Sequence, residues 1–211
     1  MSRAEAWLRV PLAEYEAHME EIGQAAALRK TFRRAYSELH PRRLLILGCT
    51  TGRDFELVDP GITTICVGVD LNREYLDAAR ERLHVLRGTL QLVQGDVLEV
   101  ELPSSAFDLI YAALVFEYVD PALLLPRIAR WLAPGGVCVA VTQNPADGVP
   151  SVTKTSHGSL EVLSGCMSLR RAEEMRRCAI RSGLAVVEQR DVALPHGKSF
   201  SAARFENAPE A

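Results

Sequence analysis

The feature that most constrains this chain is a pair of apolar runs joined through a glycine turn. The first run, residues 44–47, stops at Gly48, and a short loop leads to Gly52. The second run, residues 65–69, ends on Asp70, 22 residues after Gly48. Apolar runs without polar alternation are typical of strands buried on both faces of a parallel sheet. We therefore expect two parallel strands, with a helix that opens at residues 53–57 between them.

This turn has the layout of a site for an adenosine-type ligand. In such a layout the backbone N–H groups of the turn face the ligand, and an acid at the end of the second strand accepts hydrogen bonds from the ribose. Gly48 and Gly52 bound the turn, and Asp70 is the acid. A plain strand-to-helix turn is the alternative, which the matched distance of Asp70 disfavours. Dinucleotides and S-adenosylmethionine both use this layout.

Further strands and helices alternate along the chain. We expect further strands at 90–93, 107–113, 137–142, 184–194 and 199–205. We expect helices up to residue 39, at 72–86, at 121–132 and at 169–182. The first helix should break at Gly23, and the third, which begins at Pro121, should kink or restart at Pro126. This alternation predicts an α/β fold with a doubly wound, mostly parallel, seven-stranded, Rossmann-like sheet. A four-residue turn joins the last two strands, so the last one is antiparallel. We expect one domain over 1–211, with a helical cap at 1–40 and an α/β core at 41–205.

Composition narrows the classes of protein. The net charge of −3 and the pI near 6.0 disfavour a dedicated nucleic-acid binder. The five cysteines are odd in number and scattered, which favours reduced thiols in a cytoplasmic protein over disulfides or a metal site. No apolar run reaches 18 residues, so we expect neither a membrane span nor a signal peptide.

Ligands of such sheets bind outside the carboxyl ends of the strands. Polar residues at these ends are therefore candidates for contact with a substrate. Glu117, Tyr118 and Gln143 follow two of the expected strands, and His157 lies in a long loop at 144–168. His157 is a candidate general base because the ordinary pKa of histidine is near neutral. A structural or solvent-facing role is the alternative for each of them.

Taken in order, these motifs resemble the class I S-adenosylmethionine-dependent methyltransferases over about residues 40–205. The matching segments are LGCTTG at 47–52, VGVD at 67–70, QGDV at 94–97, FDLIYAALVFEYV at 107–119 and LAPGG at 132–136. The resemblance implies methyl transfer from S-adenosylmethionine to a small-molecule acceptor. It also implies cofactor contacts at Gly48, Cys49, Thr50, Gly52, Asp70, Leu71, Asp96, Val97, Ala112 and, on a covering helix, Tyr15; for Tyr15, packing within an apolar helix face is the alternative.

Two residues depart from the family pattern. Ile46 stands where an acid is usual, and Thr50 stands at the middle of the turn, where glycine is usual. A β-branched residue adopts a positive φ poorly. A non-catalytic protein that binds or has lost the cofactor therefore stays an alternative. An NAD-dependent oxidoreductase is less favoured, because a dinucleotide motif would need glycines at Thr50 and Arg53.

Overall fold

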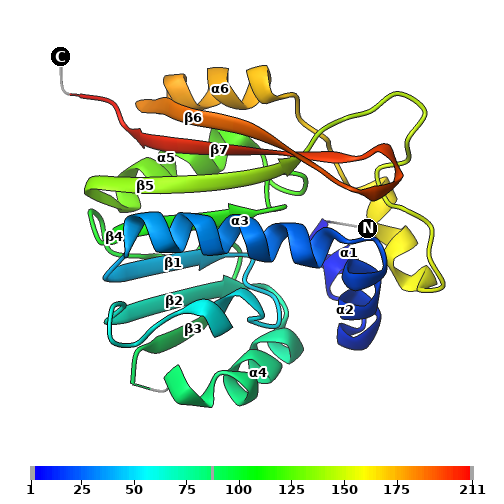
Figure 1. Cartoon of the computed structure of the whole chain (residues 1–211), viewed down its shortest axis with the longest axis horizontal. Helices are drawn as coiled ribbons and strands as arrows, with labels where there is room; N and C mark the ends of the chain where they lie inside the picture. The colour runs from blue at the N-terminus through cyan, green and yellow to red at the C-terminus, as the bar shows by residue number, and fades with distance from the viewer. Residues whose placement is uncertain (1–2, 87, 210–211) are drawn as a thin grey trace.

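The computed structural model describes residues 3–86 and 88–209, so Arg87 and the two residues at each end of the expected domain lie outside it. One seven-stranded sheet has the order β3-β2-β1-β4-β5-β7-β6 (Figure 1). Its strands are β1 (Arg43–Leu47), β2 (Ile65–Asp70), β3 (Leu90–Gln94), β4 (Phe107–Ala113), β5 (Leu132–Gln143), β6 (Leu184–Ala193) and β7 (Ser199–Asn207). Strands β1 to β5 pair in parallel, and β7 is antiparallel to β5 and β6. The expected fold class and the reversed last strand are confirmed.

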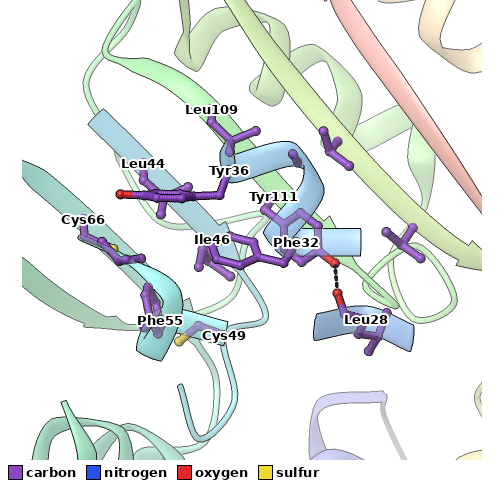
Figure 2. Close-up of a cluster of buried hydrophobic side chains, with 14 of the residues drawn as sticks. Leu28, Phe32, Tyr36, Leu44, Ile46, Cys49, Phe55, Cys66, Leu109 and Tyr111 are labelled. Carbon is purple, nitrogen blue, oxygen red and sulfur yellow. Dashed lines mark hydrogen bonds between the residues drawn. The ribbon is translucent and has the colours of Figure 1, made fainter. Parts of the chain in front are cut away.

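Helices cover both faces of this sheet. Helices α3 (Gln24–Leu39) and α4 (Arg73–Arg82) pack on one face, and α5 (Pro121–Trp131) and α6 (Ala172–Arg181) pack on the other. Figure 2 shows the core beneath α3, where Phe32 packs edge-on against Tyr111 with 5.0 Å between the ring centroids. The hydroxyl of Tyr111 donates to the carbonyl oxygen of Leu28 at 3.2 Å, which fixes α3 over the centre of the sheet.

The helix expected after the glycine turn does not form. The connection holds only the single 3-10 turn η1 (Asp54–Leu57), followed by extended chain and a turn at 60–62. Only 17 residues separate β1 from β2, and they must return along the length of a strand. Helix α3, which precedes β1, already covers this face, and Phe55 fills the remaining space. The turn therefore faces any ligand without a helix N-terminus behind it.

Other expected elements differ in their limits. Helix α5 runs on through Pro126, where we expected a kink or a restart, because its buried face holds it against the sheet. Helix α4 ends at Arg82 and is followed by the 3-10 turn η2 (His84–Leu86). Strand β5 begins at Leu132, five residues before the expected start at 137. Among the described residues, no helix is long and apolar enough to cross a membrane.

The carboxyl ends of the strands are covered by two segments that are distant in sequence. One is the N-terminal pair α1 (Arg3–Trp7) and α2 (Leu12–Glu21), which meets α3 at Gly23 with the expected break, at a φ of 72°. The other is the segment 144–168, which contains the 3-10 helix η3 (Gly158–Gly165). Figure 1 shows both segments at the same end of the sheet, beyond the carboxyl ends of the parallel strands. Ala6, Val10, Leu160 and Leu163 form the apolar contact between them. We call these two segments together the roof.

Candidate active site

A cavity lies between the strand ends and the roof. It encloses about 1210 Å³, part of which is its open mouth. Nine of the residues predicted to form the site line it: Gly48, Thr50, Asp70, Leu71, Asp96, Val97, Tyr15, Tyr118 and Gln143. The structure therefore brings the expected turn, the ends of β2, β3 and β5, and the first long helix around one space.

The turn end of the cavity is built from backbone geometry. Gly48 has a φ of 63°, and a Cβ there would lie 2.9 Å from the side chain of Val115. Thr50 also has a positive φ, 47°. A side chain at such an angle is strained, by about 1–2 kcal/mol per residue. Thr50 is therefore held in the conformation that the family pattern assigns to glycine, and its backbone N–H donates to Asp70 Oδ2 at 2.8 Å.

Asp70 is oriented by two backbone N–H groups. Besides Thr50, the N–H of Asn72 donates to Asp70 Oδ1 at 2.9 Å. Burial raises the pKa of Asp70, and the hydrogen bonds from the backbone N–H groups of Asn72 and Thr50 oppose the rise. A carboxylate has about four acceptor positions. These two bonds leave each oxygen with acceptor capacity toward the cavity, which fits a pair of adjacent hydroxyls.

Five predicted site residues lie outside the cavity lining. Cys49 and Ala112 point into the apolar core, one on each face of the sheet. Gly52 packs against the end of α4, where a Cβ would lie 3.0 Å from Ala79 and 2.7 Å from Leu83, the residue after the helix. His157 faces Glu21 on α2, with 3.7 Å between its Nε2 and the carboxylate. The fifth, Glu117, lies beneath the lining.

Glu117 supports the end of β5. Its side chain is buried, and its Oε1 accepts from the backbone N–H of Gln143 at 2.6 Å. Its Oε2 has no hydrogen-bond partner among the described residues. Burial raises the pKa of Glu117 to about 7, although the bonds from Gln143 and from its own backbone oppose the rise. The Glu117 carboxyl group therefore holds Gln143 in place, and the side chain of Gln143 lines the cavity.

Two carboxylates of α2 fasten the roof to the turn: Glu20 pairs with Arg53, and Glu16 makes several bonds. Glu16 on α2 accepts from Thr51 Oγ1 at 2.5 Å and from Arg82 Nη1 at 2.8 Å, and it pairs with Arg53 Nε at 3.3 Å. Burial opposes the ionisation of Glu16, but bonds from Arg82, Thr51 and Arg53 outweigh it and lower the pKa to about 2. An ionised Glu16 therefore joins α2 to the turn and to α4.

Aromatic side chains continue the roof above Asp70. Tyr15 lies between Trp7 and Tyr75, with ring centroids 5.7 and 5.6 Å away. The hydroxyl of Tyr75 donates to the carbonyl oxygen of Val10 at 2.9 Å, which fixes the chain between α1 and α2. Tyr15 thus has packing contacts and also lines the cavity, so both of its expected roles have support.

Two further lining residues, His18 and Lys198, were not among the predicted site residues. The Nδ1 of His18 lies 2.9 Å from Thr155 Oγ1, and burial and then the charge of Lys198 lower the pKa of its imidazole. The Nζ of Lys198 donates to the carbonyl oxygen of Ser151 at 2.9 Å. His18 follows Tyr15 by three residues, a spacing that places both on one helix face. Lys198 carried no local signal, because it lies in the turn between the last two strands.

Comparison with known proteins matches residues 45–140 to the family described as "Methyltransferase domain". An uncharacterized methyltransferase of Mycobacterium tuberculosis is 34% identical over 99 residues, which cover 45% of this chain and 37% of that relative. A trans-aconitate 2-methyltransferase of Methylobacterium nodulans is 37% identical over 103 residues, 48% of this chain and 38% of the relative. The chain thus spans less than two-fifths of the length of these relatives.

Solved structures add the fold of the whole sheet. An S-adenosylmethionine-dependent methyltransferase from Mesorhizobium loti superposes with a TM-score of 0.62 at 20% identity, over 77% of this chain and 90% of that one. At this identity the likeness establishes the fold. The matched sequence segment contains Gly48, Asp70 and Asp96, which line the cavity. Residues 45–140 are therefore similar to a methyltransferase domain, and the whole sheet has the fold of a solved S-adenosylmethionine-dependent methyltransferase.

Proposed function

We propose that this protein transfers a methyl group from S-adenosylmethionine to a small-molecule acceptor inside the cavity. The observation that carries the proposal is the position of Asp70. Its carboxylate is fixed by two backbone N–H groups, and it faces a cavity that continues from the turn to His18 and Lys198. One space can therefore hold a ribose at one end and an acceptor at the other.

The residues present fit the cofactor. Asp70 would accept hydrogen bonds from the ribose hydroxyls, Asp96 and Val97 would adjoin the adenine, and the turn at Gly48 and Thr50 would face the methionine portion. When bound, S-adenosylmethionine supplies an electrophilic methyl group on a sulfonium. The chain's part is chiefly to align the acceptor and exclude water, and orientation of this kind supplies up to about 7–11 kcal/mol in favourable systems. The roof over the cavity serves both needs.

Where the acceptor must lose a proton, His18 is better placed than the predicted His157. His18 lines the cavity, and its lowered pKa keeps the imidazole neutral near pH 7. A neutral imidazole can accept a proton. His157, in contrast, lies beyond the lining and beside Glu21. Relatives named for small acceptors, such as trans-aconitate, support an acceptor of similar size.

Calorimetry with S-adenosylmethionine, S-adenosylhomocysteine and NAD in parallel tests this function. We expect binding of the first two and none of NAD at the same concentrations. Tight binding of NAD without binding of the sulfonium would overturn the proposal. Cofactor binding without methyl transfer to any compound of a metabolite panel would favour a non-catalytic binding protein on the same fold.

A further inference from the structure

Lys198 is a buried cation without a counter-ion. Its side chain is 6% exposed, although lysine is a residue that folded proteins almost always leave in water. Its Nζ makes one hydrogen bond, to the carbonyl oxygen of Ser151. Among the described residues, no carboxylate forms an ion pair with it. An ammonium group has three N–H donors, so two remain for a ligand in the cavity.

The charges that line the cavity are divided between its two ends. The acids Asp70 and Asp96 lie at the ends of β2 and β3, whereas Lys198 directly precedes β7 and has His18 beside it. Four strand spacings separate β2 from β7 in the sheet, roughly 19 Å at ~4.8 Å per strand. Lys198 is thus the cation at the end away from Asp70, because the lowered pKa of His18 keeps its imidazole neutral near pH 7.

We propose that the acceptor carries a carboxylate, which Lys198 binds at the end of the cavity opposite Asp70. This inference rests on the proposed function and adds the chemical class of its acceptor. A carboxylate would accept charge-assisted hydrogen bonds from the ammonium group, which are among the stronger ones in proteins. An amine acceptor in its charged form would meet a like charge at this end. Lys198 therefore selects acceptors by charge.

A purely structural role for Lys198 is the competing explanation, because Ser151 belongs to the roof. That carbonyl oxygen, however, also accepts from Gln143 Nε2 at 3.0 Å, and Gln143 Oε1 accepts from Gln24 Nε2 at 3.2 Å. The amides therefore hold Ser151 and join it to α3 without a charged group. Burying an ammonium group costs free energy, and the carbonyl oxygen of Ser151 already has another donor, so a purely structural role does not account for the charge.

The test compares two probes of opposite charge and equal length, hexanoate and hexylamine, with S-adenosylhomocysteine present. Binding is measured by calorimetry on the wild type, on Lys198→Met and on Lys154→Met. Lys154 is exposed in the same roof segment, so its replacement is the matched control. We expect hexanoate to bind the wild type better than hexylamine. Lys198→Met should lose at least about tenfold in hexanoate affinity, and Lys154→Met should keep it.

Lysine NMR gives a second, independent readout. The chain has three lysines, Lys30, Lys154 and Lys198, so their side-chain signals can be assigned by single replacements. Hexanoate should raise the pKa of Lys198 alone, because a bound carboxylate favours the charged ammonium. Equal or tighter binding of hexylamine, absence of hexanoate binding, or unchanged hexanoate binding in Lys198→Met would each overturn the proposal.

The two proposals can fail separately. Binding of both probes is also measured without S-adenosylhomocysteine. If the protein does not bind the cofactor, the proposed methyl transfer is overturned, and the preference between hexanoate and hexylamine can still be measured. Conversely, an intact cofactor site with no preference between the two probes would overturn only the carboxylate acceptor.

Discussion

The two ends of the cavity are built in opposite ways. At the Asp70 end, a charged group is fixed by the backbone N–H groups of Thr50 and Asn72, both within 20 residues of it. At the Lys198 end, the ammonium meets a carbonyl oxygen from a segment 47 residues away, and His18 meets Thr155 across 137 residues. The first end is a local turn whose polar groups are largely satisfied. The second end is an assembly of distant segments that leaves a cation short of partners.

The first end can therefore be predicted from a sequence motif, whereas the second can be recognised only in the folded structure. The turn is built from residues that form a recognisable sequence motif, and we propose that it holds the cofactor. The other end is assembled from the roof and the last hairpin, and we propose that it binds the acceptor. If this comparison is right, replacements at the two ends should change stability in opposite directions.

The largest effect is expected from Asp70→Ala. Two hydrogen bonds from ribose hydroxyls to a carboxylate contribute up to ~3 kcal/mol each, so we expect S-adenosylmethionine affinity to fall at least about tenfold. The variant should also be less stable, because the N–H groups of Thr50 and Asn72 lose their acceptor. Calorimetry and thermal unfolding measure the two effects. Asp77→Ala, on the exposed face of α4, is the control. Unchanged affinity in a folded Asp70→Ala would show that the ribose lies elsewhere.

Lys198→Met is expected to change stability in the opposite direction. Removing a buried cation without a counter-ion should stabilise the free protein by about 1–3 kcal/mol at pH 7, as measured by denaturant unfolding. Burial lowers the pKa of Lys198 from 10.5 to about 8. Between these values the unfolded chain binds more protons, so wild-type stability should rise with pH from about 8 to 10.5. The variant should lack this rise. A destabilised variant would mean that Lys198 serves the structure.

A smaller effect is expected from Glu16→Gln, which weakens the joint between the roof and the turn. A charged acceptor with several donors contributes about 1.5 kcal/mol, and stability should fall by that order at pH 7. Because the pKa of Glu16 is lowered to about 2, its contribution is present above pH 4.5 and is lost as pH falls toward 2. Wild type and variant should therefore converge in acid. Glu81→Gln, at an exposed position of α4 away from this joint, serves as the control. A constant difference at every pH would exclude this electrostatic role.

The smallest effect is expected from Thr50→Gly. Glycine relieves the strained φ of 47°, but the freer unfolded chain loses ~0.5–1 kcal/mol more entropy on folding. We expect a net gain of about 0.5–1 kcal/mol in stability and equal or tighter S-adenosylmethionine binding. The hydroxyl that contacts the roof belongs to Thr51, so Thr50→Gly leaves that bond in place. A loss of affinity of more than tenfold would show that the Thr50 side chain itself contacts the cofactor.

The sequence predicted the Asp70 end well, because buried parallel strands, glycine turns and an acid at a strand end are local patterns. It was wrong about a helix after the turn. Residues 53–57 contain no proline or glycine that would prevent a helix. The connection to β2 is too short for one, however, and α3 already covers this face of the sheet. His157, and not His18, was predicted as the candidate general base. Which histidine reaches the cavity depends on how α2 packs against the segment 144–168, a contact that no local pattern contains.

A crystal structure with S-adenosylhomocysteine and hexanoate tests the central claim most directly. We expect the ribose hydroxyls within hydrogen-bond distance of both Asp70 oxygens and the hexanoate carboxylate within that distance of Lys198 Nζ. The sulfur should lie between them, over the ends of β1 and β4. Adenosine bound away from Asp70, or a carboxylate seated away from Lys198 with its alkyl chain outside the cavity, would contradict the account.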